Sequence, residues 1–139
     1  MKIVINDSKT GNSFQKELTE APVLSQLIGK KIGEKLEGSL VGLAGYSLKI
    51  TGGSDTDGTP MRFDIPGTRT LYSVLSGGTG VKHLKLGSKL KKRVAGNTVS
   101  DKTAQINVKI ETYGEKALAD LGFVPKVKEA KPKADAAKA

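Results

Sequence analysis

The residues with the most evident chemical capacity are cations that gather in the second half of the chain. Residues 65–100 contain no Asp or Glu but hold seven Lys and Arg, most of the net charge of +9. A nucleic-acid backbone is bound by several cations within reach of successive phosphates. The sequence therefore predicts RNA phosphate contacts, first from Lys82, Lys85, Lys89, Lys91, Lys92 and Arg93, and in a second rank from Lys49, Arg62 and Arg69.

Glycines bracket these cations on both sides. Because glycine lets backbone N–H groups approach a phosphate closely, we interpret residues 82–93 as a lysine-rich RNA-binding loop. The simpler interpretation is a lysine-rich loop that is only a solvated surface, and the lack of any acid over residues 65–100 counts against it. We expect the glycines to shape the backbone rather than to bind a ligand, namely Gly52, Gly53, Gly77, Gly78 and Gly96.

Aromatic residues are scarce, at 4% of the chain, and none falls between Tyr72 and Tyr113. Proteins that bind single strands stack bases on aromatic side chains. The sequence therefore predicts recognition of folded RNA through its backbone and shape, without a base-stacking platform.

The single histidine, His83, lies inside the basic stretch. A catalytic triad needs a histidine oriented by a carboxylate, and the nearest acids along the chain are Asp64 and Asp101. We expect His83 to contact phosphate or solvent, and we expect no enzymatic activity.

Residues 52–58 include Asp55 and Asp57 and look like the start of a calcium loop. Such a loop also requires a bidentate Glu at a fixed spacing, which is missing, so Asp-Gly and Gly-Gly are interpreted here as turn residues. The chain has no cysteine and no glycine-rich nucleotide-binding motif. We expect no metal, no cofactor and no small-molecule substrate.

The chain also lacks the features of a membrane protein. Residues 1–7 become polar almost at once, so we expect no signal peptide. No apolar run approaches the roughly 20 residues that span a bilayer. A membrane is therefore not among the expected partners.

The elements that position the cations are predicted to be strands. Residues 104–111 alternate strictly between apolar and polar side chains, as a half-buried strand does, and residues 46–51 repeat the pattern. Residues 14–18 and 1–5 show it less clearly. Residues 7–12 are interpreted as the turn of a first hairpin.

Two short helices complete the prediction. One runs from residue 20 to about 28, with Thr19 as its cap and Gly29 as its stop, and the other spans residues 115–121. With 17 glycines in 139 residues, we expect a mainly β fold of the β-rich α+β class, a small bent sheet or barrel. We assign residues 1–124 to a β-rich RNA-binding domain and residues 125–139 to a disordered basic tail.

A long ordered string stands at residues 45–55, Gly-Tyr-Ser-Leu-Lys-Ile-Thr-Gly-Gly-Ser-Asp. With Pro60-Met61-Arg62, Leu75-Ser76-Gly77-Gly78 and Gly96-Asn97-Thr98-Val99-Ser100, it resembles ribosomal protein S-six of the archaeal and eukaryotic type, in a short archaeal-like form. The resemblance covers about residues 1–116. One departure concerns the segment before Gly96, which in the family is rich in arginine and here is mostly lysine, with Ala95 at a usual arginine position. Lysine is a point charge without the bidentate fork of arginine.

The resemblance implies a structural, non-enzymatic component of the small ribosomal subunit in the cytoplasm, in contact with ribosomal RNA and with neighbouring ribosomal proteins. Two alternatives remain open. One is a non-ribosomal RNA-binding or assembly module, which a high-salt wash would strip from small subunits. The other is a small barrel that binds a translation factor through exposed strand faces, so that neutralising residues 82–93 would leave its function intact.

Overall fold

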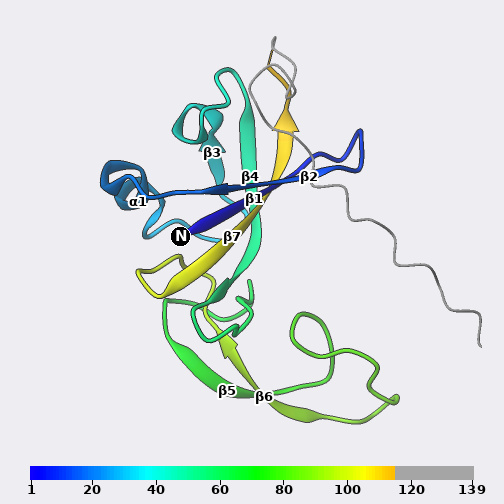
Figure 1. The fold of residues 1–139 in the computed structure, drawn as a ribbon. Coiled ribbons are helices and arrows are strands. Elements are labelled where there is room, and N and C mark those ends of the chain that lie inside the picture. The colour runs from blue at the N-terminus through cyan, green and yellow to red at the C-terminus, as the bar shows by residue number, and fades with distance from the viewer. Residues whose placement is uncertain (115–139) are drawn as a thin grey trace, which may run out of the picture.

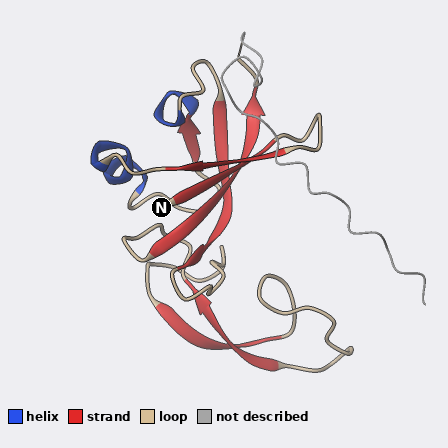
Figure 2. Ribbon diagram, viewed as in Figure 1, coloured by secondary structure: helices blue, strands red, loops and turns tan. Residues whose placement is uncertain are grey.

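Strands dominate residues 1–114, the part of the chain that the computed structural model describes (Figure 1, Figure 2). The predicted mainly β fold is therefore confirmed. In chain order the elements are β1 (Lys2–Asn6), β2 (Ser13–Glu17), α1 (Ala21–Leu27), β3 (Lys35–Glu37), the 3-10 helix η1 (Gly38–Val41), β4 (Ser47–Asp55), β5 (Thr70–Leu75), β6 (Leu90–Ala95) and β7 (Thr103–Thr112).

The larger of two sheets has five strands in the order β2-β1-β7-β4-β3. Strand β1 runs parallel to β7, and the other neighbouring pairs are antiparallel. Strands β2 and β3 stand at the two ends of this order. Within residues 1–114 the sheet is therefore open and bent, not closed into a barrel (Figure 1).

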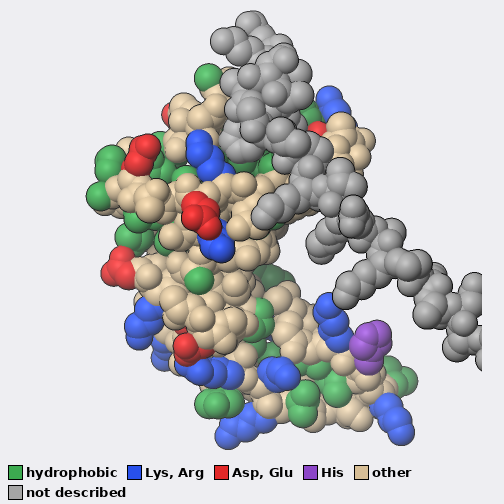
Figure 3. Space-filling view, in the orientation of Figure 1, with side chains coloured by type: hydrophobic (Ala, Val, Ile, Leu, Met, Phe, Trp, Pro, Cys, Tyr) green, Lys and Arg blue, Asp and Glu red, His purple; other side chains and the backbone are tan. Residues whose placement is uncertain are grey.

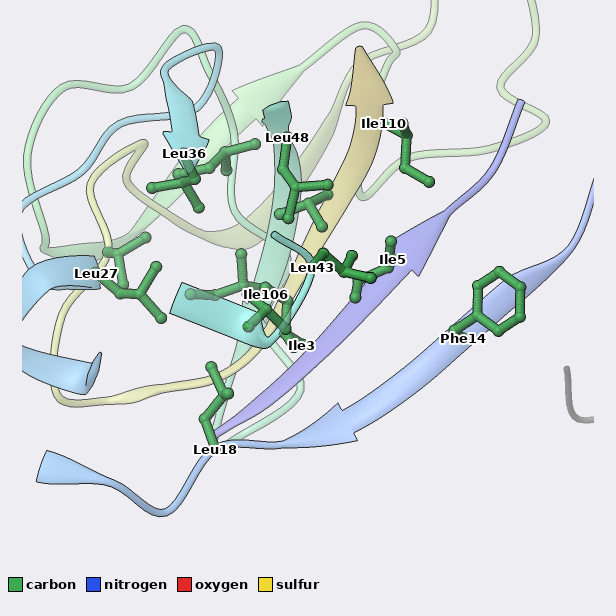
Figure 4. Close-up of a cluster of buried hydrophobic side chains, with 14 of the residues drawn as sticks. Ile3, Ile5, Phe14, Leu18, Leu27, Leu36, Leu43, Leu48, Ile106 and Ile110 are labelled. Carbon is green, nitrogen blue, oxygen red and sulfur yellow. The ribbon is translucent and has the colours of Figure 1, made fainter. Parts of the chain in front are cut away.

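The main core lies on one face of this sheet. Ile106, Val108 and Ile110 of β7 alternate along the strand, and each is at most 2% exposed. Burying one such side chain contributes about 1.5–3 kcal/mol, so the row on this central strand anchors the sheet. Figure 4 shows the apolar side chains that gather with them, among them Ile3, Ile5, Phe14, Leu18, Leu27, Leu36, Leu43 and Leu48.

The strands predicted from alternation are confirmed. The patterns at residues 104–111 and 46–51 correspond to β7 and β4, and the weaker ones at 14–18 and 1–5 correspond to β2 and β1. Residues 7–12 connect β1 to β2, which pair as an antiparallel hairpin.

The first predicted helix is present as α1, but its predicted cap is wrong. The N-cap is Glu20, and its side chain makes no capping hydrogen bond. A cap side chain accepts a hydrogen bond from the second or third backbone N–H of the helix, and Pro22 at the second position has none. Thr19 lies one residue before the N-cap, outside the helix. The stop at Gly29 is confirmed by its φ of +88°, which glycine adopts without strain.

Two predictions fall outside the described residues. They are the second helix at 115–121 and the tail at 125–139, so the division into residues 1–124 and 125–139 stays a prediction. Within residues 1–114, no helix has the length and apolar character needed to cross a membrane.

Strands β5 and β6 form a separate two-stranded antiparallel sheet below the larger one in Figure 1. One face of this hairpin packs its own small core around Val94, Leu75 and Val81. Its base is tied to the larger sheet, since Met61 bonds through its backbone to Gly53 and Arg62 bonds to Ala95. The hairpin therefore projects from the main core on a fixed base.

The existence of this hairpin corrects the interpretation of residues 82–93 as a loop. Lys91, Lys92 and Arg93 lie on strand β6, whereas Lys82, Lys85 and Lys89 lie in the segment that joins β5 to β6. Cations at three successive positions hide the alternation by which a strand is predicted from sequence.

Candidate nucleic-acid interface

The β5–β6 hairpin and its connecting segment, residues 70–95, bring most of the predicted cations together, and we call this unit the basic hairpin. In the register of the two strands, Tyr72 faces Arg93 and Val74 faces Lys91. These four side chains share the outer face of the hairpin, because side chains alternate along a strand. Tyr72 is 66% exposed and Val74 is 62% exposed, so this face is open to a partner.

The segment between the two strands adds further cations. Lys82, Lys85 and Lys89 are exposed, as is His83 beside them. His83 has a φ of +57°, and the buried side chain of Val81 holds the start of the segment against the hairpin core. Figure 3 shows Lys and Arg side chains gathered at this end of the molecule together with the one histidine.

Arg62 is a correction to the predicted site. It is only 8% exposed, and its guanidinium donates two hydrogen bonds to the Asp64 carboxylate, at 2.8 and 2.7 Å. It also donates to the backbone carbonyls of Gly77 and Thr79, at 3.2 and 2.8 Å. The bond between the two side chains raises the pKa of Arg62 and lowers the pKa of Asp64 below its usual range. Arg62 is therefore a structural anchor that fixes the segment after β5, not a free phosphate contact.

Arg93 has one competing partner. Its guanidinium donates to Asp57 at 2.8 Å, and the two side chains are 45% and 55% exposed. A surface ion pair of this kind contributes only about 0–1 kcal/mol. Arg93 can therefore exchange Asp57 for a phosphate at small cost.

Arg69 lies beside this pair, in a surface hollow of about 740 Å³. Arg93 and Lys102 also line the hollow, but so do three carboxylates, those of Asp55, Asp57 and Asp101. The positive and negative charges are equal in number, so this hollow is less suited to a polyanion than the basic hairpin is.

The carboxylates of Asp55 and Asp57 are engaged in contacts within the protein, and Asp57 pairs with Arg93. Asp55 is buried, and its carboxylate accepts hydrogen bonds from the backbone N–H of Thr56 and from the hydroxyl of Thr70. The Gly58 N–H donates to the Asp55 carbonyl at 2.9 Å, which closes a turn as predicted. No group of three or more His, Cys, Asp or Glu within residues 1–114 could hold a metal ion.

Lys49 stands apart from the basic hairpin, on the exposed side of β4. It lies directly opposite Lys35 of β3 and Lys109 of β7, so three lysines form a row across the larger sheet. Among the ion pairs of residues 1–114, the one that offsets the row joins Lys35 to Glu111 at 2.9 Å. That contact is the main reason why the pKa of Glu111 is lowered.

The predicted glycines differ in their need for a missing side chain, and Gly78 has a φ of +85° that favours glycine. A Cβ added at Gly53 would meet the Gln105 carbonyl oxygen at 2.3 Å, and one at Gly96 would meet the Gly67 carbonyl oxygen at 1.9 Å. These two positions need glycine for close backbone approach. Gly52 and Gly77 have no neighbour within 4 Å of such an atom.

The sequence analysis did not predict that the Tyr72 ring lies beside the cations of β6. The Lys91 Nζ atom lies 5.9 Å from the centroid of the Tyr72 ring, although the two residues are far apart in the chain. The signal was present in residues 70–75, Thr-Leu-Tyr-Ser-Val-Leu, whose β-branched and aromatic composition is typical of a strand. A hairpin predicted there would have brought the aromatic ring to the cations.

Known proteins resemble this chain over most of its length. Residues 1–122 match the sequence model of the family described as Ribosomal protein S6e. A protein of Methanocaldococcus jannaschii named small ribosomal subunit protein eS6 is 45% identical over 120 residues, which cover 86% of this chain and 88% of the relative. Proteins of the same name from Methanosphaera stadtmanae and Methanococcus maripaludis are 43% and 46% identical over 124 residues, which cover 89% of this chain and 93% and 94% of the relatives.

Proposed function

The chain belongs to the Ribosomal protein S6e family, and on that premise we propose that it is a structural protein of the small ribosomal subunit that binds ribosomal RNA through the basic hairpin. Its partners are then ribosomal RNA and neighbouring ribosomal proteins, and its location is the cytoplasmic ribosome. The relatives' shared name supports the assignment to the small subunit.

The observation that carries the proposal is the concentration of unpaired positive charge on one projecting element. Residues 70–95 contain no acid. Among the ion pairs of residues 1–114, none involves the five lysines of the basic hairpin, and only Arg93 has a carboxylate partner. Uncompensated cations on a single element repel one another, and a phosphate backbone relieves that repulsion while it releases counterions.

The salt dependence of RNA binding tests the role of the basic hairpin. The hairpin quadruple variant combines Lys89→Ala, Lys91→Ala, Lys92→Ala and Arg93→Ala. Each lost phosphate contact reduces the slope of log affinity against log salt by about 0.9, so the loss of four contacts should make the slope for small-subunit ribosomal RNA about 3.6 units shallower.

A matched control removes the same charge from elsewhere. The control quadruple variant combines Lys2→Ala, Lys9→Ala, Lys30→Ala and Lys31→Ala, and its slope should stay close to that of the unmodified protein. Equal slopes for the hairpin quadruple variant and the unmodified protein would remove the basic hairpin from the RNA interface.

A further inference from the structure

Exposed apolar side chains concentrate in the same part of the chain as the uncompensated cations. Five of the six large hydrophobic side chains that are exposed within residues 1–114 lie between residues 63 and 90. Single exposed apolar residues are ordinary, but Tyr72 and Val74 lie together on the outer face of the basic hairpin, and neighbouring exposed apolar side chains mark a candidate binding surface. The five are Phe63, Tyr72, Val74, Leu86 and Leu90.

Tyr72 is the best placed of the five to meet RNA. It lies on the outer face of the basic hairpin, with Arg93 opposite it on β6 and Lys91 at 5.9 Å from its ring centroid. Two thirds of its surface is exposed, so the ring contributes little to the hairpin core, which packs on the other face around Val94 and Leu75. An exposed aromatic ring with cations on the neighbouring strand offers a π-face for a base and positive charge for the phosphates beside it.

We propose that Tyr72 stacks on an unpaired RNA base while Lys91 and Arg93 hold the adjacent phosphates. The inference rests on the proposed function and names the class of nucleotide that the basic hairpin takes. Bases inside an A-form helix are stacked on each other and closed to a side-chain ring, so the ligand is a single-stranded nucleotide of a loop, bulge or end. Arg93 exchanges its contact with Asp57 for the phosphate.

The charge pattern favours RNA over a protein as the occupant of this face. The hairpin presents cations and no acid, so the covering surface must be anionic as well as able to stack. A single-stranded nucleotide combines the two properties in one unit, with a flat base and a charged phosphate.

Two RNA probes distinguish the contribution of stacking to the affinity from that of charge. One is an oligoadenylate strand and the other is an RNA duplex of the same length. Tyr72→Ala should weaken binding of the oligoadenylate about fivefold or more, since stacking of one base contributes about 1–3 kcal/mol. It should leave duplex binding unchanged. The salt slope for both probes should also be unchanged, because no charge is removed.

Two further substitutions identify the ring as the group responsible. Tyr72→Phe keeps the aromatic face and should bind oligoadenylate like the unmodified protein. Tyr72→Leu keeps apolar bulk without a ring and should lose as much affinity as Tyr72→Ala. Thermal unfolding of all three variants controls for a change in folding.

The stacking proposal is overturned if Tyr72→Ala binds oligoadenylate as tightly as the unmodified protein, or if it weakens both probes equally. If the hairpin quadruple variant still loses affinity for both probes in that experiment, only the stacking is wrong. If the hairpin quadruple variant also keeps its affinity, the proposed function of the basic hairpin fails as well.

Discussion

Arg62 and the lysines of the basic hairpin carry the same charge in opposite surroundings. The guanidinium of Arg62 is buried and already holds a carboxylate and two backbone carbonyls, whereas the lysines lie open to solvent. A planar fork with several fixed donors can satisfy these acceptors at once, and an ammonium group cannot. Arg62 therefore supports the basic hairpin from inside, and the lysines remain open to a partner.

Arg62→Lys separates these roles. The substitution keeps the charge but leaves part of Asp64 and of the carbonyls at 77 and 79 without a donor, so we expect a loss of about 2 kcal/mol in the free energy of unfolding. Urea denaturation measures this, with the exposed Arg69→Lys as the control. Because the charge is kept, the salt slope of RNA binding should stay unchanged, and a free energy of unfolding equal to that of the unmodified protein would contradict the anchoring role of Arg62.

Asp7 supplies a pH dependence of folding. Its carboxylate is buried at the first hairpin turn and accepts hydrogen bonds from the Lys9 N–H, the Thr10 hydroxyl and the Tyr113 hydroxyl. Burial by itself would raise the pKa of Asp7, but these hydrogen bonds outweigh it and lower the pKa below 3.8. The same bond to Asp7 raises the pKa of Tyr113.

The lowered pKa fixes the direction of the effect. The stabilisation from Asp7 is present above the unfolded-state pKa of 3.8 and is lost as the pH falls through the lower folded-state pKa. Asp7→Asn should therefore unfold more easily at neutral pH and show a flatter decline in stability under acid. Denaturation at several pH values checks this, and the exposed Asp101→Asn should behave like the unmodified protein throughout.

At the scale of the elements, β4 depends on a bulge. Its pairing with β7 shifts between Ile50 and Gly52, and after the shift Gly53 packs its backbone against Gln105. The Met61 sulfur also lies close, at 3.1 Å from the position of an added Cβ. The bulge thus brings the chain that leads to the basic hairpin against the larger sheet.

Neighbouring glycines give a matched test of this packing. Gly53→Ala would force a Cβ into a backbone carbonyl, and we expect it to cost about 2 kcal/mol or more of stability. Gly52→Ala meets open space and should change the free energy of unfolding by less than about 1 kcal/mol. Equal stability of the two variants in urea denaturation would contradict the close approach at Gly53.

The elements also show what a sequence can predict. Strands β1, β4 and β7 are half-buried, so alternation of side chains such as Ile106, Val108 and Ile110 marks them. Strand β6 is buried only at its end, at Val94 and Ala95. The three cations before Val94 replace the alternation of apolar and polar side chains by which a strand is predicted. The hairpin and the place of Tyr72 depend on pairing between distant segments, which local patterns do not contain.

The candidate site was predictable in composition but not in arrangement. The lack of acids over residues 65–100 located the cations correctly in the chain. It did not show that Arg62 is buried, because burial depends on the carbonyls at 77 and 79 that only the folded turn brings to it. It also did not show that Lys49 lies on the larger sheet, apart from the cations of the basic hairpin.

At the scale of the whole molecule, two surfaces each gather several positive charges. The basic hairpin projects from the larger sheet, and the row of Lys35, Lys49 and Lys109 crosses the exposed face of that sheet. Like charges directly opposite on neighbouring strands are destabilising. Glu111 offsets the charge of that row, whereas the lysines of the basic hairpin have no carboxylate partner among the described residues. Binding of an anion therefore relieves more charge repulsion at the basic hairpin than at the row.

The most direct test is sucrose-gradient sedimentation of tagged protein from its own cells, first in low salt and then in high salt. The unmodified protein and the control quadruple variant should remain in the small-subunit peak in both. The hairpin quadruple variant should leave that peak in high salt and run at the top of the gradient. If it instead stays in the small-subunit peak in high salt, the basic hairpin is not what holds this protein on ribosomal RNA.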